Sequence, residues 1–177
     1  MEPLAHASIG LMAKPFAPKA PVWALVAATA VPDLLYMFGF HPAGIEHEAV
    51  THFDFDHGLQ YQRPPSIPWS HGLSMCIVWS ALVAAIAFLF CRDRRTSIVI
   101  GLMVLSHWGL DFIVYPIMPL FFDNSQMIGL GLMTSKRGFI ASVILEIGLI
   151  TGGIETYWIT RKRTTIQARE KGKLSAG

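Results

Sequence analysis

His107 and Asp111 are two ionisable residues, four positions apart, in an apolar stretch of the chain. In a helix this spacing puts both side chains on one face, one turn apart. An ionisable side chain in hydrocarbon costs about 2.5–3.5 kcal/mol on insertion scales, so such residues in a membrane segment are candidates for a functional site. Imidazole and carboxylate are also ligands of zinc and other borderline divalent ions. The pair therefore predicts a metal site inside a membrane, with a structural ion pair as the alternative.

The composition predicts an all-α integral membrane protein. Of the 177 residues, 53% are hydrophobic and 15% are charged, whereas soluble domains have about 25% charged residues. A membrane-spanning helix needs about 20 mainly apolar residues. We expect one helical domain over residues 1–177, with four spans at about 21–40, 71–91, 97–120 and 138–160.

A short N-terminal helix is expected before the first span. The first 13 residues are apolar but too few to cross a bilayer, and Pro15 and Pro18 separate them from the first span. This helix either lies on the membrane surface or inserts as a half-helix. Insertion from the cytoplasmic side would raise His6 about 10 Å into the membrane, toward the level of His107.

Basic residues predict the orientation of the spans. Arg92, Arg94 and Arg95 fill the link between the second and third spans, and a basic tail follows the fourth at 161–177. The positive-inside rule places both of these segments, and both termini, on the cytoplasmic side. Residues 41–70 then form an outer loop rich in His, Asp and Glu. Its length favours either a solvated polar loop or a functional one, such as a lid or a second metal-binding surface.

Ionisable residues from all four spans are expected at similar depths. Counted along the helices, Asp33 and Glu146 lie about 10–12 Å below the outer surface. Proline breaks the third span near Pro116, which puts Asp111 about 6 Å deep and His107 about 12 Å deep. The outer half of the membrane then contains five ionisable side chains: Asp33, His71, His107, Asp111 and Glu146.

This set is chemically competent to hold a divalent metal, with zinc as the expected ion, and such a site could serve a membrane-embedded hydrolase. The expected ligands are Asp33, His71, His107 and Asp111. A bound metal lowers the pKa of its water to about 7. Glu146 is expected as a further ligand or as the general base, and Asp33 is expected to serve catalysis as well as the metal. A shallow site suits a lipid head group that enters sideways while its tails stay in the bilayer.

Four short motifs are spread over most of the chain. They are His6 followed by Gly10; Val31-Pro32-Asp33-Leu34; Pro68-Trp69-Ser70-His71-Gly72-Leu73; and Leu105-Ser106-His107-Trp108-Gly109-Leu110-Asp111. In order and spacing they resemble the bacterial membrane-bound, metal-dependent hydrolases, the group that includes a LexA-regulated inner-membrane protein. Gly129-Leu130-Gly131-Leu132 and Leu145-Glu146 resemble the pattern of one branch of that family.

The resemblance implies a divalent metal held by His6, Asp33, His71, His107 and Asp111, with Glu146 as a further candidate. It also implies a helical arrangement similar to that of zinc-dependent phospholipase C, and hence a phosphoester substrate. Two features depart from the family pattern: Gly72 stands where a serine is common, and residues 115–118 replace a more polar stretch.

Two other classes of function would use the same residues. A carrier of metal ions or protons needs polar groups that reach both faces of the membrane, whereas here Glu155 is the main acid of the inner half. A noncatalytic membrane subunit would use its polar residues only to fix helix packing. We therefore expect a hydrolase of the bacterial inner membrane that acts on a membrane lipid at the outer face, with no nucleic-acid partner.

Overall fold

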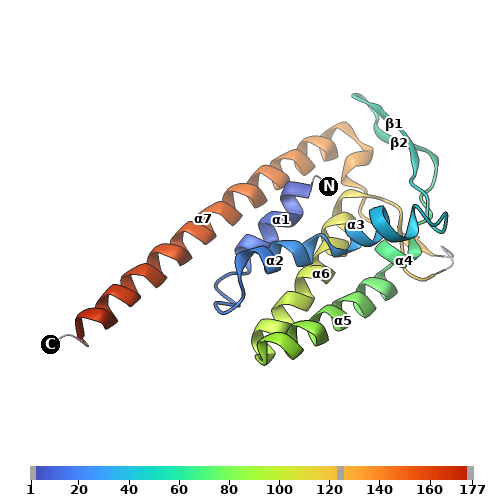
Figure 1. The fold of residues 1–177 in the computed structure, drawn as a ribbon. Coiled ribbons are helices and arrows are strands. Elements are labelled where there is room, and N and C mark those ends of the chain that lie inside the picture. Colours follow the sequence, from blue (N-terminus) through green and yellow to red (C-terminus); the bar gives the residue numbers. More distant parts are fainter. Residues whose placement is uncertain (1–2, 123–125, 175–177) are drawn as a thin grey trace.

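The computed structural model describes residues 3–122 and 126–174, and the protein is mostly helical (Figure 1). Three helices are long and apolar enough to cross a membrane, and a bent pair of short helices counts as a fourth span if taken together. The three long helices are α5 (Leu73–Cys91), α6 (Arg94–Val114) and α7 (Lys136–Leu174). These helices support the helical, multi-pass membrane protein that the composition predicts.

The first apolar stretch is broken. α2 (Val22–Thr29) is followed after Ala30 by α3 (Val31–Leu35) and by the π-helical segment η1 (Tyr36–Phe40), and the two halves are bent by 60°. Pro32 lies in the first turn of α3, where its missing N–H costs no helical hydrogen bond, although it cannot continue the helix before it. A continuous helix over residues 21–40 is therefore wrong, and Asp33 lies at the start of a separate short helix.

The second stretch also begins with a break. The short helix α4 (Pro68–His71) ends at Gly72, and α5 begins at Leu73. A Cβ atom on residue 72 would lie 2.3 Å from the carbonyl oxygen of Pro68, so only glycine fits at this corner. His71 consequently belongs to α4 rather than to the span itself.

The third span ends before its prolines. α6 ends at Val114 and Tyr115 has an extended backbone, as Pro116 predicts. The expected span reached residue 120, but residues 115–120 are not helical, because β3 (Met118–Pro119) pairs instead with β4 (Met127–Ile128). The 3-10 helix η2 (Leu132–Thr134) then leads into α7, which continues beyond residue 160 through much of the basic tail.

Part of the outer loop is an antiparallel hairpin. β1 (Val50–Asp54) pairs with β2 (Gly58–Arg63), with Thr51 opposite Tyr61. The hairpin packs on the start of α7: the Phe53 ring lies 4.8 Å from that of Phe139. In Figure 1 it covers the end of the helices opposite the link between α5 and α6.

The N-terminal helix α1 (Pro3–Met12) is inserted rather than lying on the surface. It runs beside α2 and α7 (Figure 1). A Cβ on Gly10 would lie 2.8 Å from the backbone of Val26, and one on Gly153 would lie 2.8 Å from the carbonyl oxygen of Ser8. Small residues let helix backbones approach this closely, and α1 can therefore reach into the bundle as a half-helix.

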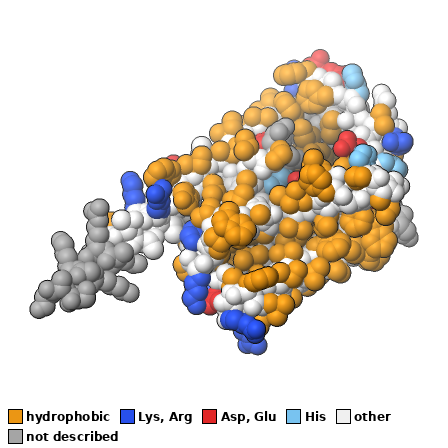
Figure 2. All heavy atoms as spheres, in the orientation of Figure 1, with side chains coloured by type: hydrophobic (Ala, Val, Ile, Leu, Met, Phe, Trp, Pro, Cys, Tyr) orange, Lys and Arg blue, Asp and Glu red, His pale blue; other side chains and the backbone are white. Residues whose placement is uncertain are grey.

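Apolar side chains cover the outside of the helices (Figure 2). On α5, Ile77, Leu82 and Phe90 are exposed, as expected where lipid rather than water is the solvent. The core packs Leu25 of α2 against Val104 of α6, with small residues of the α1–α2 segment around them. Because both the core and the outside of the helices are apolar, a buried ionisable side chain is unusual in this protein.

Candidate metal centre

Three short helices and the regular helix α6 bring five ionisable side chains together. The ligand atoms of His6, His107 and Asp111 lie within 4.8 Å of one another, and so do those of Asp33, His71 and His107. His107 belongs to both groups. The five residues are those that the sequence predicts as ligands, and they come from α1, α3, α4 and α6.

The two carboxylates each lie between two imidazoles. Asp111 Oδ1 is 3.4 Å from His6 Nε2, and Asp111 Oδ2 is 3.3 Å from His107 Nε2. Asp33 Oδ1 is 3.3 Å from His71 Nε2 and 3.5 Å from His107 Nε2. Ligand atoms about 2.0–2.1 Å from a tetrahedral zinc are about 3.3–3.4 Å from one another. The spacing of the donors within each group therefore fits a bound ion.

His107 presents the nitrogen that a metal needs. Its Nδ1 is 2.8 Å from the carbonyl oxygen of Thr29. A carbonyl only accepts, so Nδ1 carries a proton, and in the neutral ring Nε2 has the lone pair. The side chain is 1% exposed, and within the described chain Nε2 makes no hydrogen bond. A buried lone pair that faces two carboxylates at 3.3–3.5 Å fits a cation between them.

His6 reaches the site because α1 is inserted. Its ring stacks on that of His107, with the ring centroids 4.0 Å apart. Lys19, which follows α1, is 2.7 Å from Asp93 in the link between α5 and α6. The segment thus runs from the level of the candidate ligands to the basic end of the bundle.

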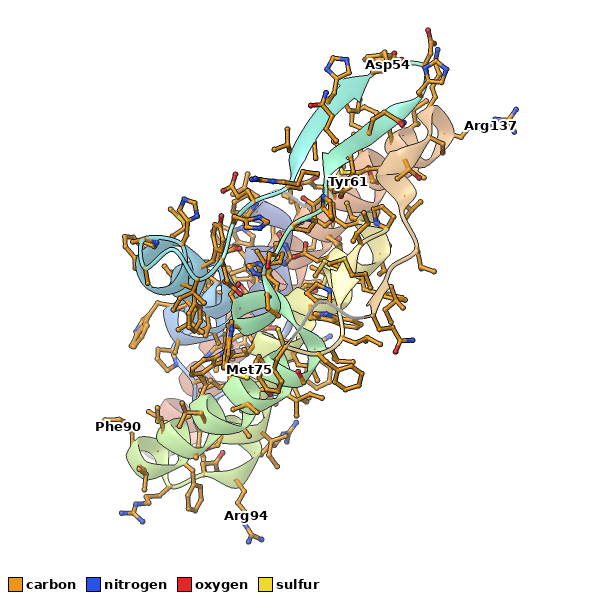
Figure 3. All side chains as sticks on the ribbon, turned by 90° about the vertical axis from the view of Figure 1, so that its right-hand side faces the viewer. Asp54, Tyr61, Met75, Phe90, Arg94 and Arg137 are labelled. Carbon is orange, nitrogen blue, oxygen red and sulfur yellow. The ribbon has the colours of Figure 1, made fainter. Side chains whose placement is uncertain are left out.

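A cavity of about 410 Å³ opens onto the five residues. One wall is the inner end of the hairpin, with Thr51, Leu59 and Tyr61, and another is the segment after α6, with Tyr115 and Met118. Figure 3 shows Tyr61 where the hairpin meets the helices, and Asp54 at its far tip. The volume is in the range of small-molecule sites.

Tyr61 contributes a hydroxyl group to this cavity. Burial, with a smaller effect of the Asp111 carboxylate, raises the pKa of Tyr61 to about 12. The hydroxyl therefore keeps its proton at neutral pH and can donate a hydrogen bond. Tyr61 could not be identified from the sequence, because a tyrosine in an amphipathic strand has no distinguishing pattern.

The charge of the cavity is negative before any ion is bound. Its lining contains the carboxylates of Asp33, Glu48 and Asp111, and within the described chain no Lys or Arg contributes to it. Carboxylates are costly in an apolar interior unless they are paired or coordinated. A bound cation would compensate this charge.

Glu146 does not lie with the other predicted residues. It is half-buried on α7, and among the described residues it belongs neither to the cavity lining nor to the two groups of ligand atoms. Its expected depth does not specify which way its side chain faces, and its role as ligand or general base stays a prediction.

Comparison with protein-family models, with curated proteins and with solved structures finds no match to the chain.

Proposed function

We propose that this protein is a membrane-embedded hydrolase that holds one divalent metal ion, with zinc as the expected ion, and cleaves a lipid phosphoester. The observation that supports it most is the buried Nε2 of His107, which faces both carboxylates. The residues that would hold the ion are His6, Asp33, His71, His107 and Asp111. We include in the proposal that the chain is a member of the bacterial membrane-bound, metal-dependent hydrolases, because the motifs behind that resemblance contain all five.

A single ion per chain is favoured over two. The two ligand groups share His107, and its Nδ1 is already engaged by the Thr29 carbonyl. One imidazole nitrogen can therefore serve only one ion here. A two-metal site would need a bridging ligand other than this ring.

The metal would supply a water of lowered pKa and would polarise the phosphoryl oxygen. Among the five residues, Asp33 has the most exposed side chain, at 39%, while the others are 10% exposed or less. We assign to Asp33 the role of accepting the proton of the attacking water, because its carboxylate is accessible from the cavity. Tyr61 would donate a hydrogen bond to the phosphoryl group.

The arrangement supports hydrolysis at the outer face of a bacterial inner membrane. Figure 3 shows Asp54 of the hairpin and Arg94 of the basic link at opposite ends of the protein, with Tyr61 nearer the hairpin end. If the basic link is cytoplasmic, the cavity and the hairpin face outward. The first described turn of α1 then lies at the depth of the site and not at the cytoplasmic surface, where both termini were expected.

Metal analysis of the purified full chain tests the proposal. We expect about one equivalent of zinc, a loss of most of it in His107→Ala and Asp111→Ala, and no loss in His52→Ala, an exposed histidine of the hairpin. The metal-loaded protein should hydrolyse at least one phospholipid or polyprenyl phosphate of a panel, and chelation should abolish the activity.

Two results would contradict the hydrolase. The first is a protein that turns over no panel member and carries the metal across liposome membranes, which would favour the transport function. The second is full activity after exhaustive chelation, which would exclude a role for the metal.

A further inference from the structure

Glu46 is a buried carboxylate outside the group of predicted ligands. It precedes the hairpin in the outer loop, and its residue is 2% exposed. Its Oε1 accepts hydrogen bonds from the backbone N–H of Trp69 at 2.7 Å and of Ser70 at 2.9 Å. Its Oε2 is 2.6 Å from the hydroxyl of Ser70. Both oxygens thus bind the short helix that carries His71.

The direction of these hydrogen bonds fixes a proton on His71. A carboxylate only accepts, so the Ser70 hydroxyl donates its single proton to Glu46. The Ser70 oxygen, 2.7 Å from His71 Nδ1, must then accept from that nitrogen. His71 therefore carries a proton on Nδ1, and its Nε2 faces the centre, 3.3 Å from Asp33 Oδ1, where a bound ion would replace the proton shared with that carboxylate.

We propose that Glu46 is a positioning residue for the metal centre: through Ser70 it holds His71 in the tautomer that can ligate the ion. The inference rests on the proposed metal site. Carboxylates that orient metal-binding histidines typically change metal affinity by about 10–100-fold when they are lost. Here a serine hydroxyl is inserted between the carboxylate and the imidazole.

The same contacts connect the outer loop to the metal centre. Beside Glu46, the backbone groups of His47 and Ser66 exchange two hydrogen bonds of 3.0 Å. The two ends of the segment that carries the hairpin are thereby joined next to α4. The loop that forms one wall of the cavity thus also orients a ligand on the cavity floor.

The variant Glu46→Gln reverses the proton order with little change of shape. Its carbonyl oxygen can still accept from the two backbone N–H groups, which leaves its NH₂ group facing Ser70. The hydroxyl must then accept from that amide and donate to His71 Nδ1, so the proton of His71 moves to Nε2. Ser70→Ala removes the relay and leaves His71 free to adopt either tautomer.

The test combines imidazole tautomers with metal affinity. Nitrogen-15 NMR of the metal-free full chain in detergent identifies the protonated nitrogen of His71, and competition with a chromophoric chelator gives the zinc affinity. We expect Nδ1–H in the wild type, and Nε2–H in Glu46→Gln with a zinc affinity about 10–100-fold lower. Ser70→Ala should give mixed tautomers and a smaller loss. The control Glu155→Gln, an exposed acid on α7, should change neither.

The double variant Glu46→Gln/Ser70→Ala separates this role from a merely structural one. Without the Ser70 hydroxyl, residue 46 has no hydrogen bond through which it can set the tautomer of His71. The double variant should therefore bind zinc no more weakly than Ser70→Ala alone. An unchanged His71 tautomer in Glu46→Gln overturns the proposal. If Glu46→Gln does not fold, the proposal is overturned when His71 in Ser70→Ala has the same tautomer as in the wild type. If the His71 tautomers are as expected but the wild type binds no zinc, the proposed function is refuted. The hydrogen-bond chain from Glu46 through Ser70 to His71 would still be supported.

Discussion

His107 is the residue that the two groups of ligand atoms share. Its Nδ1 is held by a backbone carbonyl, and its Nε2 faces Asp33 and Asp111. A carbonyl of the main chain cannot be removed by substitution, so this tautomer is fixed by the fold itself. For His71 the tautomer depends instead on the side chains of Ser70 and Glu46. The two histidines are thus oriented by different means for the same purpose.

Removing the hydroxyl of Tyr61 should slow turnover without loosening the metal. Tyr61 lines the cavity but is not in either ligand group, so Tyr61→Phe is expected to lower kcat by about 10²-fold, the effect of one lost donor to a developing negative charge. Zinc affinity should stay within about twofold. The matched control is Tyr157→Phe on α7, which should change neither quantity. Unchanged turnover in Tyr61→Phe would exclude a contact between this hydroxyl and the reacting group.

The tip of the hairpin contains an ion pair whose strength should depend on pH. The backbone N–H of Asp56 donates a hydrogen bond to the Asp54 carboxylate, and the His57 ring donates another. Both bonds lower the pKa of Asp54 below 3.8, the first more than the second. The bond to Asp54 raises the pKa of His57 above 6.5, with a lesser effect of the Asp56 charge. The stabilisation of the folded protein that comes from the raised pKa of His57 is complete below pH 6.5 and is lost as pH rises through that raised pKa. The stabilisation that comes from the lowered pKa of Asp54 is complete above pH 3.8 and is lost as pH falls through that lowered pKa.

Asp54→Asn tests this pair directly. An amide offers no negative charge, so the pKa of His57 should fall back toward 6.5 in an NMR titration of its ring protons. Glu155→Gln, far along α7 from the hairpin, should leave the titration of His57 as it is in the wild type. The same pKa in Asp54→Asn as in the wild type would mean that the pair does not form in solution.

Single residues differ in how far the sequence predicts them. The five candidate ligands could be found because ionisable groups are rare in apolar helices, and the structure brings all five together. Glu46 could not, since it is one acid among several in a polar loop and is buried only by the return of the chain to α4. Glu146 lies outside the two groups, because depth along a helix does not specify rotation about its axis, and its role stays a prediction.

Breaks in the helices, rather than long regular helices, position most of the candidate ligands. Asp33 follows the bend between α2 and α3, His71 precedes the corner at Gly72, and His6 lies on a half-helix. A continuous span at either bend would send these side chains along a different direction. Only His107 and Asp111 come from a regular span, and they fix the floor of the site on α6.

Gly72→Ala should displace α4 and weaken metal binding. The added Cβ would lie 2.3 Å from the carbonyl oxygen of Pro68, so the corner must open and carry His71 and Ser70 with it. We expect the zinc affinity to fall at least about tenfold, because His71, a candidate ligand, is displaced from the site. The control is Gly148→Ala on α7, where a Cβ meets nothing within 4 Å of the described atoms. Equal zinc affinity in wild type and Gly72→Ala would show that α4 tolerates the shift.

The elements of the fold were predictable to the extent that local pattern decides them. Apolar length identified the helices that could span a membrane, and Pro116 correctly indicated the end of α6. The hairpin was not expected, because β1 and β2 alternate weakly and their pairing depends on the packing of Phe53 on α7. The sequence does not distinguish a surface position of α1 from insertion, since only tertiary contact through Gly10 and Gly153 decides between them.

Charged side chains are unevenly distributed over the face of the protein that Figure 2 shows. In Figure 2 most of the Lys and Arg side chains in view gather toward one end, while several Asp, Glu and His side chains gather toward the other. The cavity lining is acidic. Lys136, at the start of α7, is paired with the hairpin: its Nζ is 3.0 Å from Asp56 Oδ1. Within the described chain, the lining offers no cation of its own to an anionic substrate.

This separation predicts which phosphoesters the site accepts. The bound ion would compensate one phosphoryl group, but a further negative charge would meet Glu48 at the rim without a Lys or Arg to balance it. At an effective dielectric constant of about 20, one such repulsion over about 10 Å costs roughly 1–2 kcal/mol, about a tenfold effect on kcat/KM. Singly charged phosphodiester lipids, such as phosphatidylglycerol, should therefore be cleaved about tenfold better than a polyprenyl diphosphate in the same detergent.

Glu48→Gln should narrow that preference, because it removes the repelling charge while leaving the candidate ligands intact. Rates are best compared at equal surface concentration of lipid and at two salt concentrations, since added salt should also narrow the gap. A polyprenyl diphosphate cleaved as fast as the phosphodiester, and with the same ratio in Glu48→Gln, would mean that the charged group of the substrate lies outside this cavity. The electrostatics of the lining would then have no part in selecting the substrate.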